Sequence, residues 1–405
     1  MTTPASTGHA SSAPTRAVSS RDLSWLRGEL SHWTADGLVS DDQATRILQR
    51  YHASRRFSLS TLVLTLGALF VGVGLIWLVA ANLDQLSPLA RFLVVAAFWA
   101  VVTVVGEWLS ARHAHSGGIP SPVVAAVQLL AAASFGAVVF QAAQSLQVPA
   151  YEPKLVGIWA LGALVHAYAS RALMPLLVGL ATGTFWFVWQ TTWDAGSLLG
   201  VVLAFVAAGV IGVGLGALHE RWWPSFAPAW REVGVVLLLI GLFAGAIPGV
   251  DSELTWTVSL AIGLGMAAVV AVLGLALGVG RLRLEPVAAV VVGAIAVALA
   301  LWETGGDSEV VTAGDWLHAG VAVVAYVLMA TAVAALGVLR DSWRLTALAT
   351  IALVIFTTFQ SFAVFARIIE GAWLFVILGV VFLATGFLAD RARRRLAQEL
   401  EGEES

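Results

Sequence analysis

From residue 58 onward, the chain alternates between long apolar stretches and short polar connections. Each stretch holds about 20 residues, the length that an α-helix needs to cross about 30 Å of hydrocarbon. The pattern predicts an all-α fold, a polytopic transmembrane helical bundle with about 12 spans. The predicted spans are 58–81, 89–109, 122–146, 154–170, 172–191, 197–218, 232–249, 254–279, 286–302, 316–338, 345–366 and 371–389. Because only Ser170 and Arg171 separate the fourth from the fifth, these two form either one tight hairpin or a re-entrant pair.

A shorter amphipathic pattern precedes the first span and predicts a small cytoplasmic helical hairpin. Leu23, Leu26, Leu30 and Trp33 recur at helical spacing, and Gly37 then stops the helix. Ser40 stands three residues before Gln43, the spacing of a capping box. Ala44, Ile47, Leu48 and Tyr51 continue one apolar face. We therefore divide the chain into a disordered tail (1–20), a helix-turn-helix hairpin (21–57), a transmembrane helical domain (58–389) and a charged cytoplasmic tail (390–405).

The composition supports membrane insertion and excludes several classes of protein. Hydrophobic residues make up 59% of the chain and charged residues 12%, against about 25% charged in ordinary soluble domains. This excludes a soluble enzyme, a nucleic-acid-binding protein and a wholly disordered chain. Cysteine is absent, so disulfides, zinc–thiolate sites and cysteine nucleophiles are excluded as well. The eight histidines are scattered, and we expect no metal site and no cofactor.

Arginine separates the connections into two alternating sets. One set, which includes both chain ends, carries 14 arginines, whereas the other carries only Arg91, Lys154 and Arg367. Positive residues favour the cytoplasmic side of a membrane. The alternation therefore predicts an even number of spans with the N- and C-termini in the cytoplasm.

The hairpin and the end of the first span together resemble a known family. The segments LRGELSHWTADGLVSDDQATRILQRY and LIWLVAANLDQLSPLARF are similar to bacterial polytopic membrane proteins of the domain-of-unknown-function 2157 family. That family shows L-x-x-W-x-x-x-G-L-I-S-x-x-Q-A-x-x-I-L-x-x-Y and a first span ending in A-A-N-W-D, where this chain has Leu83 for the Trp. The resemblance implies this architecture in a bacterial plasma (inner) membrane, and no reaction.

Polar residues gather near the predicted outer ends of spans 1 to 5. A water-filled outer vestibule would satisfy them together, although each could instead cap its own helix end. The candidates are Asn82, Asp84, Arg91, Gln141, Gln144, Glu152 and Gln190. Deeper ionisable residues are few, and we expect Glu107 and His166 to reach the interface or to bond a neighbouring helix.

Three functions follow from these features. The first is a non-catalytic sensor or scaffold that docks a protein partner through residues 21–57, with Trp33, Gly37, Gln43 and Tyr51 as candidate docking residues. The second is a transporter or channel-like protein for a small polar solute that enters the outer vestibule. The third is a membrane enzyme that acts on lipid-linked substrates through Asp84. No span carries a charge near its centre, which disfavours ion-coupled transport.

We take the docking function as the first expectation and expect no enzymatic activity. Membrane lipid surrounds the spans. Nucleic acid is not expected as a partner because Asp41 and Asp42 open the second helix of the hairpin, which has no broad basic face. The oligomeric state stays open.

Overall fold

The computed structural model describes residues 16–18, 20–53, 87–116, 121–149, 151–193, 197–247, 253–302, 313–340 and 342–363, with isolated positions within 66–74 and 379–383. The chain divides into two compact units, Met1–Gly74 and Leu75–Ser405. The predicted spans 58–81 and 371–389 lie almost wholly outside the described residues.

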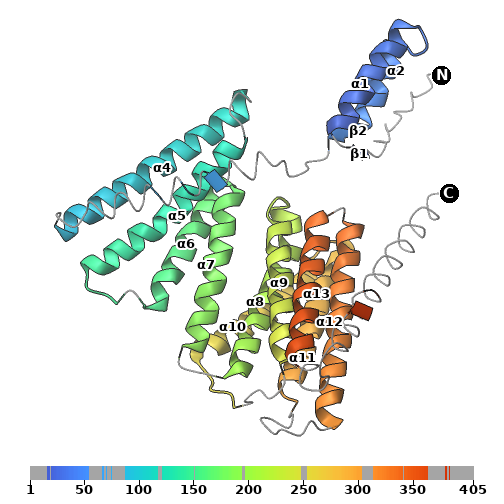
Figure 1. Ribbon diagram of the computed structural model, residues 1–405. Helices are drawn as coiled ribbons and strands as arrows, with labels where there is room; N and C mark the ends of the chain where they lie inside the picture. The colour runs from blue at the N-terminus through green and yellow to red at the C-terminus, as the bar shows by residue number, and fades with distance from the viewer. Residues whose placement is uncertain are drawn as a thin grey trace, which may run out of the picture. The chain divides into compact units, whose positions relative to one another are not determined.

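In residues 16–53 the structure describes two helices, α1 (Ser20–Ala35) and α2 (Asp41–Gln49) (Figure 1, blue). Two short strands, β1 (Arg16–Val18) and β2 (Tyr51–Ala53), pair in parallel beside them. Strand β1 falls in the stretch that the sequence assigned to the disordered tail. Residues 16–18 form a strand because their backbone N–H and C=O groups pair with those of residues 51–53, which follow α2.

Within residues 87–363 of the second unit, the structure describes ten long helices at the positions of the predicted spans 2 to 11. They are α4 (Pro88–Ser116), α5 (Ser121–Ser145), α6 (Pro153–Ser170), α7 (Leu173–Thr192), α8 (Leu198–Trp222), α9 (Ala227–Gly245), α10 (Val258–Leu277), α11 (Glu285–Ala300), α12 (Ala313–Leu339) and α13 (Trp343–Ala363). Among the described residues, nine helices are long and apolar enough to cross a membrane. The exception is α6, which has 18 residues and includes Lys154 and His166. The prediction of an all-α transmembrane bundle is confirmed.

The closely spaced spans 4 and 5 form two separate helices joined by a tight turn. Arg171 ends α6 in the left-handed conformation, with φ 55°, and the amide of Ala172 donates to the carbonyl of Ala167 at 3.1 Å. Helix α7 starts two residues after Arg171 and packs along α6. Helix α7 with its 20 residues is about 30 Å long at about 1.5 Å per residue, and the choice between a spanning hairpin and a re-entrant pair stays a prediction.

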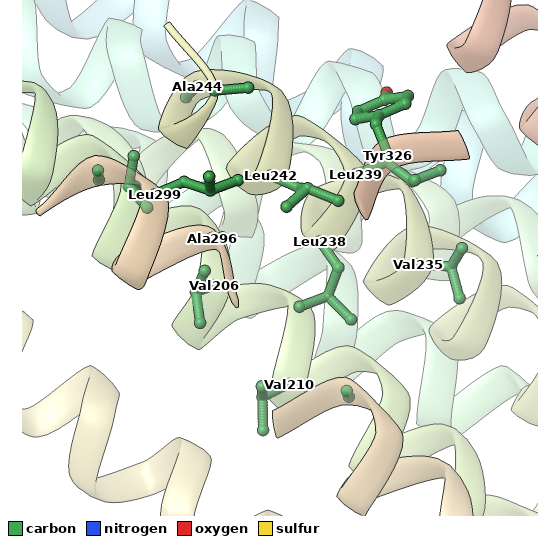
Figure 2. Close-up of a cluster of buried hydrophobic side chains, with 14 of the residues drawn as sticks. Val206, Val210, Val235, Leu238, Leu239, Leu242, Ala244, Ala296, Leu299 and Tyr326 are labelled. Carbon is green, nitrogen blue, oxygen red and sulfur yellow. The ribbon is translucent and has the colours of Figure 1, made fainter. Parts of the chain in front are cut away.

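Helices α8 and α9 form the centre of the second unit. Helix α8 packs along α9 and also contacts α10 and α11, whereas α12 packs along α13 (Figure 1). Figure 2 shows the apolar core at this centre, where Val206 and Val210 of α8 lie near Leu238 and Leu242 of α9. Tyr326 of α12 joins the same core and stacks on Phe356 of α13, with the ring centroids 3.8 Å apart.

Glycine allows the backbones of α8 and α9 to touch. A Cβ on Gly212 would lie 2.6 Å from the Cα of Gly234, and a Cβ on Gly234 would lie 2.5 Å from the amide nitrogen of Val213. Both distances are shorter than a carbon atom can approach without displacing the neighbour. Close packing through small residues is one source of helix–helix attraction in lipid, where apolar side chains gain little by leaving the hydrocarbon.

We expect Gly234→Ala to lower the free energy of unfolding by about 1–3 kcal/mol, because the added methyl group must push α8 away from α9. The matched control is Gly265→Ala on α10, where an added Cβ meets no atom within 4 Å. That control should stabilise the helix by about 0.5–1 kcal/mol. Thermal unfolding of the purified variants in detergent measures both, and equal shifts would contradict the proposed contact.

Candidate functional site

The turn between α1 and α2 is fixed by two consecutive capping motifs. Gly37 has φ 71°, and its amide donates to the carbonyl of Thr34 at 3.1 Å, while the amide of Leu38 donates to the carbonyl of Trp33 at 2.9 Å. These are the two bonds of a Schellman motif, which ends α1. The predicted capping box then opens α2: the Gln43 amide donates to Ser40 Oγ at 3.3 Å, and the Ser40 amide donates to Gln43 Oε1 at 3.0 Å.

A groove runs along α2 within the first unit. Its cavity volume is about 500 Å³, and its lining combines apolar side chains with two arginines: Leu38, Val39, Gln43, Arg46, Ile47, Arg50 and Tyr51. Helix α2 has no buried residue, and the side chains of Ile47 and Leu48 are only half-buried. Leu38 is 73% exposed. The apolar face that the sequence predicts for α2 is therefore only half-buried within this unit.

The four candidate docking residues have different places in this geometry. Gly37 and the backbone of Trp33 shape the turn, and the Trp33 side chain is half-buried. Gln43 caps α2 and also lines the groove. Tyr51 lines the groove from the start of β2. The structure thus brings Gln43 and Tyr51 to one surface, while Gly37 and the Trp33 carbonyl set the turn beside it.

The candidate vestibule is partly described. Asn82 and Asp84 lie outside the described residues. The other five lie at helix ends: Arg91 in the first turn of α4, Gln141 and Gln144 in the last turns of α5, Glu152 just before α6, and Gln190 near the end of α7. Because Ser145 Oγ donates to the carbonyl of Pro88 at 3.3 Å, the end of α5 meets the start of α4. A shared vestibule stays a prediction.

Charged residues that the sequence did not single out meet at the opposite helix ends. Arg231 of α9 donates through Nε to Glu285 Oε2 at 2.8 Å and through Nη2 to Glu220 Oε1 at 2.7 Å. Arg340, just after α12, donates to Glu285 as well and lies 3.7 Å from Glu220. The Arg231 side chain is only 4% exposed. We call these four residues, Glu220, Arg231, Glu285 and Arg340, the charge network.

The charge network joins three connections that are far apart in the sequence. They are the α8–α9 connection, the start of α11 and the α12–α13 connection, where Arg344 also pairs with Glu232 at 3.1 Å. All three belong to the arginine-rich set that the sequence predicts on one side of the membrane. Their meeting at one end of the bundle is what the predicted alternation requires.

Histidine, tyrosine and tryptophan form a second polar cluster at helix ends close to the charge network. Trp230 Nε1 donates to Tyr168 Oη at 2.9 Å, which leaves the Tyr168 hydroxyl to donate to His219 Nε2 at 2.6 Å. His219 Nδ1 then donates to the carbonyl of Leu215 at 2.7 Å. His166 and Glu107 pair at 3.0 Å between α6 and α4, so their expected contact with a neighbouring helix is present.

An apolar cavity of about 430 Å³ lies beside the charge network. It is lined by α9, α11, α12, the short 3-10 helix η2 (Gly280–Leu284) and Val213 of α8. Arg231, Glu285 and Arg340 are its only charged lining residues among the described part of the chain. No sequence pattern pointed to this cavity, because its walls come from four separate segments whose apolar residues look like ordinary lipid-facing positions.

Two polar side chains in the core of α12 and α13 also escaped the sequence analysis. Gln360 is 2% exposed, and among the described residues neither its amide nitrogen nor its amide oxygen has a hydrogen-bond partner. His318 is equally enclosed; its Nε2 donates to the carbonyl of Leu299 at 3.2 Å, and its Nδ1 has no partner. Among the residues that the structure describes, no group of three His, Asp or Glu side chains is placed to hold a metal ion.

Comparison with protein families tests the resemblance. Residues 31–176 match the family of predicted membrane proteins DUF2157. The DUF2157 stretch runs from the last turns of α1 to the start of α7, and it includes the capping motifs and the groove. The resemblance expected from the hairpin is thereby confirmed for this part of the chain. The charge network and the apolar cavity lie beyond it.

The other two comparisons add no relative: no curated protein and no solved structure matches this chain. The DUF2157 match and the apolar helices together establish a membrane protein with multiple membrane-spanning helices embedded in lipid. They assign no activity.

We expect Arg231→Gln to lower the free energy of unfolding by about 3–5 kcal/mol, because it leaves the carboxylates of Glu220 and Glu285 short of a buried partner. Lys154→Gln is the matched control, since Lys154 is 74% exposed and pairs with Glu152 at 3.6 Å. An exposed pair of this kind contributes at most about 1 kcal/mol. The measurement is the thermal unfolding temperature in detergent. If the charge network does not stabilise the fold, both variants will show the same small shift.

Proposed function

We propose that this protein is a non-catalytic integral membrane protein, a sensor or scaffold, that docks a protein partner in the groove of its N-terminal hairpin. In this proposal the hairpin and both chain termini lie on the cytoplasmic side of a bacterial plasma membrane. The arginine-rich connections support that orientation.

One observation carries the proposal: α2 is amphipathic, yet it has no buried residue. A nine-residue helix is too short to be stable in isolation, so its apolar face normally packs on something. Here Ile47 and Tyr51 instead line an open groove. Leu38, which is 73% exposed, extends the apolar surface to the turn.

The lining also indicates the chemistry of the partner. Among the described residues that line the groove, only Arg46 and Arg50 are charged, and both are exposed. Arg46 uses its Nε to bond the carbonyl of Asp42, which leaves its terminal nitrogens for a carboxylate. The groove therefore suits a protein segment that combines apolar side chains with Asp or Glu.

The rigid turn supports the same function. The Schellman motif and the capping box fix the path of the chain from α1 into α2, so the groove does not have to be ordered when the partner binds. Preformed surfaces bind more tightly because less conformational entropy is lost on association. In this view Gly37 and Gln43 act by shaping the surface, whereas Tyr51 contacts the partner.

We expect the full chain in lipid nanodiscs to enrich, from a random displayed peptide library, peptides that pair apolar residues with Asp or Glu. Arg46→Glu should weaken binding of those peptides by about tenfold or more, because loss of a charged hydrogen bond costs about 1.5–3 kcal/mol. Arg27→Glu on α1 is the matched control, since Arg27 is equally exposed and does not line the groove.

Titration of the best enriched peptide gives the dissociation constants. The proposal fails if no peptide is enriched over empty nanodiscs, or if Arg27→Glu weakens binding as much as Arg46→Glu. Ile47→Ala should also weaken binding, and circular dichroism of each variant confirms that the helices are retained.

A further inference from the structure

We propose that the apolar cavity beside the charge network holds an acyl chain of an anionic phospholipid, with the phosphate at Arg340 and Arg283. This lipid site is independent of the docking groove, because it is built entirely from the second unit.

The walls of the cavity fit a hydrocarbon chain. They are formed by leucine, valine, alanine and methionine side chains from α8, α9, α11, α12 and η2. A volume of about 430 Å³ lies within the range of small-molecule sites. Apolar cavities of proteins do not hold ordered water, because water needs polar partners.

The lipid around the helices is the source of the proposed acyl chain. The cavity is open on the side bordered by Leu284, Ala288 and Ala332, all of which are exposed. In a chain embedded in lipid, the exposed sides of these apolar helices face hydrocarbon. An acyl chain can therefore enter between α11 and α12, which have few contacts with each other.

Charge at the mouth selects an anionic head group. Among the charged side chains that the structure describes at this end, Arg221, Arg231, Arg283, Arg340 and Arg344 stand against Glu220, Glu232 and Glu285, a surplus of positive charge. Basic pockets between transmembrane helices on the cytoplasmic side are a recurrent receptor for anionic lipid head groups. Apolar walls with a basic mouth match the two ends of a phospholipid.

Two arginines have the capacity to bind the phosphate. Arg340 lines the cavity with a side chain that is 19% exposed; among the described residues it donates one hydrogen bond, to Glu285, and lies 3.7 Å from Glu220, which leaves further N–H donors of its guanidinium for a phosphate. Arg283 is exposed and lies on η2 between Leu282 and Leu284, two wall residues. Arg231, by contrast, donates to both Glu285 and Glu220 and is nearly enclosed, so it holds the helices together.

The experiment uses the full chain purified in detergent, with extraction and mass spectrometry of the phospholipid that stays bound. Wild type should retain phosphatidylglycerol or cardiolipin, and Ala288→Phe should reduce the retained amount at least fivefold by filling the cavity. The matched control is Ala294→Phe, on the exposed side of α11 and outside the cavity lining.

A second arm separates the head group from the chain. Added cardiolipin should raise the unfolding temperature of wild type more than phosphatidylcholine does, whereas inorganic phosphate should not raise it. Arg283→Gln should reduce that preference, and Arg221→Gln, which removes an exposed arginine outside the cavity lining, should not.

Each other outcome overturns the proposal. If wild type retains no phospholipid and Ala288→Phe unfolds at a lower temperature than Ala294→Phe, protein fills the cavity, either another part of this chain or a second copy. If Ala288→Phe and Ala294→Phe retain equal amounts of phospholipid, the lipid binds outside the cavity. Equal stabilisation by both lipids, or stabilisation by inorganic phosphate, removes the assignment of an anionic lipid head group.

Discussion

Hydrocarbon tolerates neither unpaired backbone groups nor isolated charges, and this constraint explains most of the structure. Helices satisfy their own backbone, so the chain crosses as helices. Ionisable side chains collect where the helices end, and those that are enclosed there pair. The charge network is the clearest result, because Arg231 is almost fully enclosed and both of its carboxylate partners come from other helices. Its four residues tie together three connections of the second unit.

The same constraint separates two kinds of surface. In the second unit, exposed apolar residues such as Val258 and Leu328 face lipid and need no further partner. We propose that the N-terminal hairpin, with its exposed Leu38 and half-buried Ile47, faces water, where open apolar surface indicates an interaction. The proposed docking groove and the proposed lipid site thus rest on the same question, namely what covers apolar surface in water and what covers it in hydrocarbon.

The sequence predicted helix positions well because span length and hairpin capping are local properties. The helix break at Arg171 and the capping pair of Ser40 with Gln43 could both be predicted from residues that are close in the sequence. The charge network and the cavity were not, since each depends on which helices lie side by side. Arg231 and Glu285 looked like ordinary charges at helix starts, and only the packing of α8, α9 and α11 shows that they bond.

The central claim is that the arginine-rich connections share one side of the membrane and the other connections share the opposite side. This chain has no cysteine, so single cysteines can report the side directly. We predict that Arg221→Cys and Arg283→Cys react with an impermeant thiol reagent only from the cytoplasmic side, and Leu146→Cys and Trp256→Cys only from the outside. Reaction of Arg283→Cys and Leu146→Cys from the same side would contradict the account.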